Sequence, residues 1–301
     1  MDHRPFRVGS LAVIGAVLLG GCATTAISSS IVTTTTSTTP PVAPVAEPEA
    51  TPVAEPDVVT APESTLAPTT TVEPLGREIV EVSALETAIP AIGTSSGAEA
   101  ARLQQRLLDL GYWVQATDGE YGLTTRQAVM AFQKYEGLPP TGSLDEATAA
   151  RISEVETRPF GRAQAGTMVE VDKAKQLLFV IDEGQTRWVL NASTGSEIPY
   201  SEPNSNNPDI VEEGDSVTPV GLHKVNRERE EGWWEGDLGQ IYRPKYFRGG
   251  VAVHGANSVP EYPASHGCVR VSVPAMDWIW DQGLLPIGSL VWVHGEIPDR
   301  T

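Results

Sequence analysis

The chain contains two cysteines, and the second, Cys268, lies within residues 265–270, which read SHGCVR. A thiolate is a strong nucleophile, and a nearby imidazole can generate it by accepting the thiol proton. Two histidines are close in the sequence, His254 and His266. The pattern therefore predicts covalent catalysis by Cys268 with a histidine as general base.

The two histidines have different expected positions. His254 ends an apolar run at 251–253, so we expect its ring to project from the end of a strand. The carbonyl of Gly255 is then placed to accept the second ring proton and to fix the tautomer, as the third member of a triad. His266 precedes Cys268 by two residues, so on a strand both side chains would share a face. These residues leave open which histidine is the base.

Further residues of the same segment have expected roles. Gly267 lets a substrate backbone approach, and its amide and that of Cys268 are candidates to stabilise an oxyanion. Arg270 either binds a substrate carboxylate in a bidentate contact or holds the loop through backbone carbonyls. His254, His266 and Cys268 would also suit zinc, but no CxxC, HExxH or HxH spacing supports a metal. We expect neither a metal nor a cofactor.

The elements that must position these residues follow residue 158. Strands with a buried or alternating pattern are expected at 168–171, 176–181, 188–190, 221–225, 250–254 and 289–293. One amphipathic helix is expected at 274–281. Residues 166–296 therefore predict a mainly β domain, a sandwich with one or two short helices.

Residues 98–156 have a helical pattern instead. A leucine repeat at helical spacing ends at Gly111, and Thr124 with Gln127 predicts a capping box at the start of a second helix. A third short helix is expected at 145–152. The segment therefore predicts a small all-α module of three helices.

The N-terminal third predicts export rather than a further domain. Residues 1–22 combine a basic start, an apolar run and two glycines before Cys22, as in a lipoprotein signal peptide whose cysteine is lipidated. Residues 23–97 are rich in Thr, Ser, Pro, Ala and Val without a period, which predicts a disordered linker. With Cys22 lipidated, we expect an N-terminal membrane anchor and no disulfide framework.

The net charge of −18 at pH 7 excludes the clustered basic surface that nucleic-acid binding requires. The acidic residues are spread along the chain, a pattern typical of a soluble surface. We therefore expect no nucleic-acid partner.

Two resemblances carry the functional prediction. The helical segment resembles the three-helix peptidoglycan-binding domain at 103–107 (LQQRL), 110–112 (LGY), 118–122 (DGEYG), 128–133 (AVMAFQ) and 141–142 (TG). The β segment, over about 166–294, resembles the L,D-transpeptidase family at 193–195 (STG), 218–221 (TPVG), 246–250 (YFRGG), 254–255 (HG) and 265–270.

The second resemblance implies a β-sandwich of the L,D-transpeptidase type that acts on peptidoglycan stem peptides. Cys268 would attack the carbonyl of the third residue of a tetrapeptide stem and expel the terminal D-alanine. The thioester would pass to an amine of another stem, giving a 3→3 cross-link. His254 would be the base, and carbapenem β-lactams are expected to acylate the thiol.

The same resemblance implies roles for the surrounding residues. His266 and Gly267 would shape the catalytic site, while Ser265 and Gly255 would line it beside the substrate. Tyr246, in preference to Tyr242, would contribute a hydroxyl near the oxyanion. With the wall-binding module and the lipid anchor, the protein is expected on the outer face of the cytoplasmic membrane, reaching into the cell wall.

Several alternatives stay open. Residues 196–217 form a long acidic insertion that either attracts the acceptor amine or is a solvated loop; its acidic residues are Glu197, Glu202, Asp209, Glu212, Glu213 and Asp215. The same thioester passed to water would make an L,D-carboxypeptidase. A non-catalytic wall-binding protein is the third reading.

Overall fold

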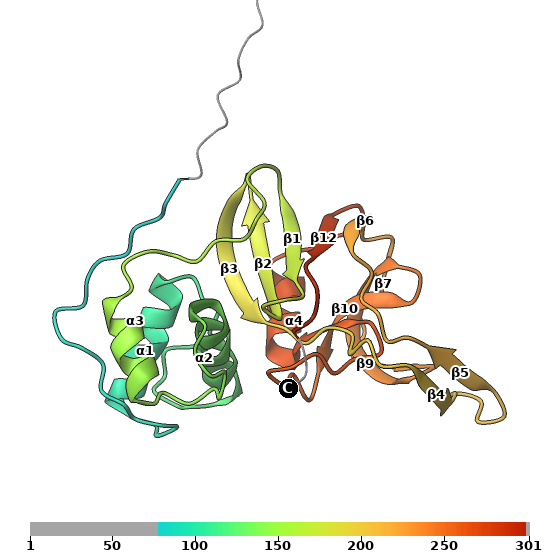
Figure 1. Cartoon of the computed structure of the whole chain (residues 1–301), viewed down its shortest axis with the longest axis horizontal. Coiled ribbons are helices and arrows are strands. Elements are labelled where there is room, and N and C mark those ends of the chain that lie inside the picture. The colour runs from blue at the N-terminus through green and yellow to red at the C-terminus, as the bar shows by residue number, and fades with distance from the viewer. Residues whose placement is uncertain (1–77, 299–301) are drawn as a thin grey trace, which may run out of the picture. The chain divides into compact units, whose positions relative to one another are not determined.

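The computed structural model describes residues 78–298 (Figure 1). The predicted signal peptide with Cys22 and the greater part of the predicted linker lie outside the described residues, so both stay predictions. Within 78–298, no helix combines the length and the apolar character that crossing a membrane requires.

Three helices form the module that the sequence predicts: α1 (Ala98–Asp109), α2 (Leu123–Glu136) and α3 (Glu146–Glu154). Leu103, Leu107 and Phe132 are fully buried between them. The side chain of Asp145 caps α3 by accepting from the amide of Thr148 at 2.8 Å.

The predicted capping box of α2 is wrong. The helix begins at Leu123, its N-cap is Gly122, and no side chain caps it. Thr124 therefore lies inside the first turn. The glycine takes the extended conformation of an N-cap, which it can do without the side-chain hydrogen bond that serine or threonine would add.

The predicted linker also ends earlier than residue 97. Ile89 is 2% exposed within the core of the helical module. Its amide donates to the hydroxyl of Ser153 at 3.0 Å, and Glu81 forms a β-bridge with Thr157. The last part of the predicted linker is therefore packed against the module, because its scattered apolar residues find a surface there that the sequence pattern does not reveal.

Two sheets form the β domain. The first has the strand order β3-β2-β1-β12-β6, with β1 parallel to β12 and the other pairs antiparallel. Its strands are β1 (Met168–Asp172), β2 (Leu177–Asp182), β3 (Gln185–Asn191), β6 (Gly221–Lys224) and β12 (Leu290–His294).

The second sheet has the order β11-β10-β9-β7, and β8 pairs with β9. Its strands are β7 (Arg227–Glu228), β8 (Trp233–Gly236), β9 (Gly239–Arg248), β10 (Val251–Ala256) and β11 (Val269–Ser272), and helix α4 (Val273–Asp281) follows. Much of the acidic insertion forms a separate hairpin of β4 (Tyr200–Pro203) and β5 (Val211–Gly214), which projects from the domain in Figure 1.

The two sheets and α4 share one apolar core. Val171 and Val291 from the first sheet, Val253 and Val269 from the second, and Ile279 from α4 are all fully buried in it. Burial of each such side chain contributes about 1.5–3 kcal/mol. The predicted mainly β sandwich with a short helix is confirmed.

The helical module packs on β3 and β2 through a second core that contains Phe132 and Phe179. At its edge the ammonium of Lys134 donates to the side-chain oxygen of Asn191 at 2.5 Å and to the carbonyls of Gln176 and Ala192 at 3.2 and 3.1 Å. Burial lowers the pKa of Lys134 to about 7, with Glu261 nearby opposing that shift.

Candidate active site

The residues with catalytic chemistry lie on one face of the second sheet. Ala252 of β10 is paired with Tyr246 of β9, and Val253 with Val269 of β11. Continuing the parallel register by one residue places Cys268 opposite Ala252, whose backbone amide bonds to the sulfur. Residues that are paired across a sheet share a face, so Cys268, Ala252 and Tyr246 form a row across three strands.

His254 lies within β10, which continues to Ala256, so the prediction that it ends the strand is wrong. It is paired with Arg270 on β11 and lies two residues from Ala252, so its ring shares the face of Cys268. The predicted hydrogen bond to Gly255 is confirmed: Nδ1 lies 2.8 Å from that carbonyl. A carbonyl can only accept, so Nδ1 carries the proton and Nε2 is the unprotonated nitrogen.

Burial governs the charges of the nucleophile and the base. It lowers the pKa of His254 to about 4, and the positive charge of Arg270 acts in the same direction, while the bond to Gly255 opposes both. Burial also raises the pKa of the Cys268 thiol, against the opposing effects of the Ala252 amide and Arg270. At neutral pH the pair is therefore a neutral thiol and a neutral imidazole, as a general base mechanism requires.

His266 lies in the turn before β11, so the prediction that it shares a strand face with Cys268 is wrong. Its Nε2 lies 3.3 Å from a carboxylate oxygen of Glu202. The ring of Tyr200 meets it edge-on, with centroids 4.7 Å apart. The acidic insertion therefore contacts the site through the β4–β5 hairpin.

The turn before Cys268 is held by Ser265. Its hydroxyl donates to the carbonyl of Cys268 at 2.5 Å and accepts from the amide of Gly267 at 3.0 Å. The prediction that the Gly267 amide serves an oxyanion is therefore wrong, because that amide already has a partner. Gly267 has φ of 130°, and a Cβ there would lie 2.9 Å from the carbonyl oxygen of Val217, so the position requires glycine.

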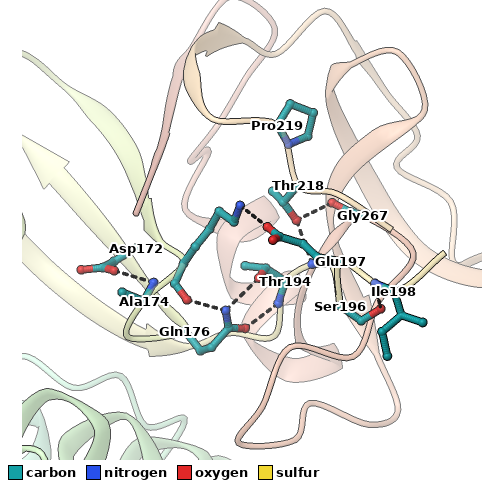
Figure 2. A network of polar contacts seen from close by, with 12 residues as sticks. Asp172, Ala174, Gln176, Thr194, Ser196, Glu197, Ile198, Thr218, Pro219 and Gly267 are labelled. Atoms are coloured by element: carbon teal, nitrogen blue, oxygen red, sulfur yellow. Dashed lines mark hydrogen bonds and ion pairs between the residues drawn. The ribbon is translucent and has the colours of Figure 1, made fainter. Parts of the chain in front are cut away.

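A polar network behind this turn links it to distant segments (Figure 2). The hydroxyl of Thr218 donates to the carbonyl of Gly267 at 2.7 Å and accepts from the amide of Gly195 at 2.8 Å. Next to it, the side-chain amide of Gln176 bonds both ways with Thr194, at 2.8 Å in each direction. Sequence reasoning assigned no role to Gln176 or Thr218, although Thr218 opens the TPVG motif.

The acidic insertion contributes to this network as well. Glu197 accepts from the ammonium of Lys173 at 2.5 Å, and its amide donates to the carbonyl of Ser216 at 3.2 Å. Lys173 is buried, while the carboxylate of Glu197 is about one third exposed at 33%, so the ion pair lies at the edge of the domain surface. The first residues of the insertion are therefore anchored to the domain, and they do not form a wholly solvated loop.

A cavity of about 500 Å³ opens over the row that contains the thiol. It is lined by residues of the motif and of the surrounding strands, among them Cys268, His254, His266, Ser265, Arg270, Tyr246, Tyr200, Glu212, Arg227, Arg229, Trp234 and Glu235. Its size is in the range of small-ligand sites. Tyr242 does not line it; the hydroxyl of Tyr242 donates to Asp277 at 2.9 Å. Of the two candidate tyrosines, the structure places Tyr246 in the cavity.

Arg270 lines the same cavity, and its guanidinium has neither an ion pair nor a hydrogen bond with a residue in the range 78–298. Its backbone instead exchanges two hydrogen bonds with Ser193, at 3.1 and 2.9 Å. Arg270 had two predicted roles. The hydrogen bonds from its side chain to backbone carbonyls, which would hold the loop, are absent within 78–298. The guanidinium is left available to a ligand.

The site agrees with the comparisons to known proteins. Residues 166–293 match the family described as the L,D-transpeptidase catalytic domain, and residues 96–152 match the peptidoglycan binding domain. The crystal structure of an L,D-transpeptidase from Xylanimonas cellulosilytica is 42% identical, covers 70% of this chain and 100% of its own, and has a TM-score of 0.61.

Two curated proteins share shorter segments. The localization factor PodJL of Caulobacter vibrioides is 38% identical over 74 residues, which are 25% of this chain and 7% of that protein. The N-acetylmuramoyl-L-alanine amidase CwlM of Mycobacterium tuberculosis is 35% identical over 65 residues, which are 22% of this chain and 16% of that protein. The chain thus spans a small part of these relatives. The match over the whole of the Xylanimonas structure is decisive: this chain belongs to the L,D-transpeptidase family.

Proposed function

We propose that this protein is a peptidoglycan L,D-transpeptidase that forms 3→3 cross-links through a thioester on Cys268. The observation that carries the proposal is the arrangement of Cys268 and His254 on one face of the sheet, at a cavity of about 500 Å³. The family membership supplies the reaction class, and the geometry supports the roles of the residues.

In the acylation step, Nε2 of His254 takes the thiol proton as the sulfur attacks the carbonyl of the third stem residue. The tetrahedral intermediate collapses, the imidazolium returns the proton to the leaving nitrogen, and D-alanine departs. Tyr246 lines the cavity beside this row and is the proposed donor to the oxyanion.

In the transfer step, the side-chain amine of another stem attacks the thioester and His254 accepts its proton. The sulfur leaves as a thiolate and takes that proton back from the imidazolium, which restores the neutral pair. The new amide is the cross-link. The carboxylates of Glu202 and Glu212 face this region from the β4–β5 hairpin and support the proposed attraction of the acceptor amine.

We place the enzyme on the outer face of the cytoplasmic membrane, with the helical module holding it at the wall. The matched peptidoglycan binding domain supports the wall contact. The lipid anchor at Cys22 rests on the sequence pattern alone, because that residue lies outside the described range.

The test is incubation of the full chain with purified tetrapeptide muropeptides, followed by mass analysis of the products. The proposal expects released D-alanine together with cross-linked dimers. Tripeptide monomers without dimers would instead establish a carboxypeptidase, and no release of D-alanine would contradict catalysis altogether.

A carbapenem provides a second measurement on the nucleophile. One acyl adduct is expected on the wild-type chain and none on Cys268→Ala. A folded wild-type protein with a reduced thiol and no adduct would favour the non-catalytic wall-binding alternative.

A further inference from the structure

Two arginines outside the family motifs lie in the catalytic cavity, on β7 and directly after it. Arg227 is paired with Tyr246, and its guanidinium stacks on that ring at 3.9 Å from the centroid. Arg229, two residues further, stacks on Trp234 at 3.6 Å. Because residues two apart on an extended strand share a face, both guanidiniums line the same side of the cavity.

Neither guanidinium has a hydrogen-bond acceptor in the described part of the chain. No carboxylate between 78 and 298 lies within ion-pair distance of Arg227 or Arg229, and the Nε of Arg229 is buried without a partner. Stacking uses the face of a guanidinium and leaves its N–H edge free. Arg227 is exposed, so the argument from burial applies to Arg229 alone: a buried N–H without an acceptor is unfavourable, which favours a ligand that supplies one.

The carboxylates that line the cavity do not serve as acceptors for these arginines. Glu212 accepts from the amide of Asn204 at 2.7 Å, and Glu235 accepts from Gln240 at 3.1 Å. Planar guanidiniums with free edges match a carboxylate in a bidentate contact.

The sheet determines how far this group lies from the thiol. Ala252, Tyr246 and Arg227 are paired across β10, β9 and β7, and Cys268 lies directly before β11, one residue before the pair of Val253 and Val269. Three strand spacings of about 4.8 Å separate the two ends of the row, roughly 14 Å between backbones. An arginine side chain reaches back over part of this span, so a bound carboxylate lies on the order of two peptide residues, at ~3.5 Å each, from the reacting carbonyl.

We propose that Arg227 and Arg229 form a carboxylate-binding subsite that recognises the donor peptide two residues away from the scissile bond. The terminal carboxylate of the leaving residue lies too close to the thiol to reach this subsite. The subsite thus distinguishes donor peptides with a free carboxylate from those in which the same group is a carboxamide. This inference rests on the proposed function, because it assumes a peptide donor at Cys268.

The experiment measures kcat/KM for acylation of the full chain by synthetic tetrapeptides. Three donors are compared: the parent with a carboxylate at the second residue, the same peptide with a carboxamide there, and one with a carboxamide at the terminal residue. The wild type is expected to lose at least tenfold in kcat/KM on the second donor. Arg229→Gln and the double variant Arg227→Gln/Arg229→Gln should reduce this ratio to about twofold or less.

The same variants should keep the wild-type response to the terminal carboxamide, which a general loss of structure would not spare. Arg229→Lys retains the charge without the planar edge. It should therefore retain only part of the preference in kcat/KM for the carboxylate over the carboxamide at the second residue. Arg187→Gln, on the exposed face of β3 with a solvent-exposed partner in Asp182, is the matched control and should behave as the wild type.

The outcomes separate this inference from the proposed function. An active wild type that does not distinguish the carboxylate from the carboxamide at the second residue would overturn the subsite. So would arginine variants that retain the tenfold ratio. A wild type that accepts none of the three donors would instead overturn the proposed function itself.

Discussion

In the helical module, the guanidinium of Arg106 donates to the backbone carbonyls of Ser83, Ile152 and Val155, whereas in the catalytic cavity that of Arg229 meets an aromatic ring and no acceptor within 78–298. Where the helical module packs on the first sheet, the ammonium of Lys134 likewise has three oxygen acceptors.

The difference separates two uses of a cationic side chain. In the module, the guanidinium of Arg106 compensates carbonyls at the end of α3 and in the segment before α1, so it stabilises the fold. In the cavity, the guanidinium of Arg229 stacks on Trp234 and its buried Nε has no acceptor within 78–298, so it is prepared for a ligand. Burial alone therefore does not identify a binding residue; the count of satisfied donors does.

The largest expected effect concerns the cavity. Cys268→Ala should lower cross-linking by at least about 10³-fold, because no covalent intermediate can form. Its midpoint of thermal unfolding should stay close to that of the wild type, since the hydrogen bonds of the thiol are weak ones, to the Gly250 carbonyl at 3.7 Å and with the Ala252 amide. Cross-linking that survives the substitution would assign the chemistry to another group.

Matched substitutions of Arg106 and Arg229 test whether the two arginines differ in their contribution to stability. Arg106→Met leaves the buried carbonyls of Ile152 and Val155 without this donor and should lower the free energy of unfolding by about 2–4 kcal/mol. Arg229→Met removes no hydrogen bond and should change it by less than about 1 kcal/mol. Urea unfolding of both variants measures this. Equal losses would show that the cavity arginine is structural.

Lys134 predicts a pH dependence of stability. Its pKa is about 7 in the fold and near 10.5 when unfolded, so between these values the unfolded chain binds one more proton. The free energy of unfolding must therefore rise with pH over this window. Relative to Lys134→Met, the wild type should gain about 3 kcal/mol between pH 7 and 9.5. If the difference in free energy of unfolding between the wild type and Lys134→Met stayed constant or fell with pH, the amine of Lys134 would remain charged in the folded protein.

The smallest expected effect concerns the acid side of the pH–rate profile for acylation. With a pKa of about 4, lowered from 6.5, His254 stays a neutral base throughout mildly acidic conditions. The acylation rate should change less than about twofold between pH 5.5 and 7 through this group. Stopped-flow acylation by a carbapenem measures it, and a limb centred near 6.5 would indicate an exposed imidazole in the working enzyme.

Much of the fold and of the reactive pair was predictable from contiguous residues. The thiol, its motif and the nearby His254-Gly255 pair lie within seventeen residues, so their chemistry and family resemblance can be recognised in one dimension. The helical periodicity and the alternating strands likewise depend on local spacing. The errors are local too: the N-cap of α2, the continuation of β10 past His254, and the turn at His266 each depend on neighbours that a short window does not contain.

The sequence by itself determined the nucleophile, the base and the two kinds of module, because residue type and short-range spacing specify them. Tertiary structure alone decided which distant residues share the cavity. The row from Cys268 to Arg227 exists because neighbouring strands pair at Ala252 and Tyr246, and Tyr200 and Glu202 contact His266 from the β4–β5 hairpin. Pairing between strands depends on the hydrogen bonds and packing of the whole sheet, which no segment encodes alone.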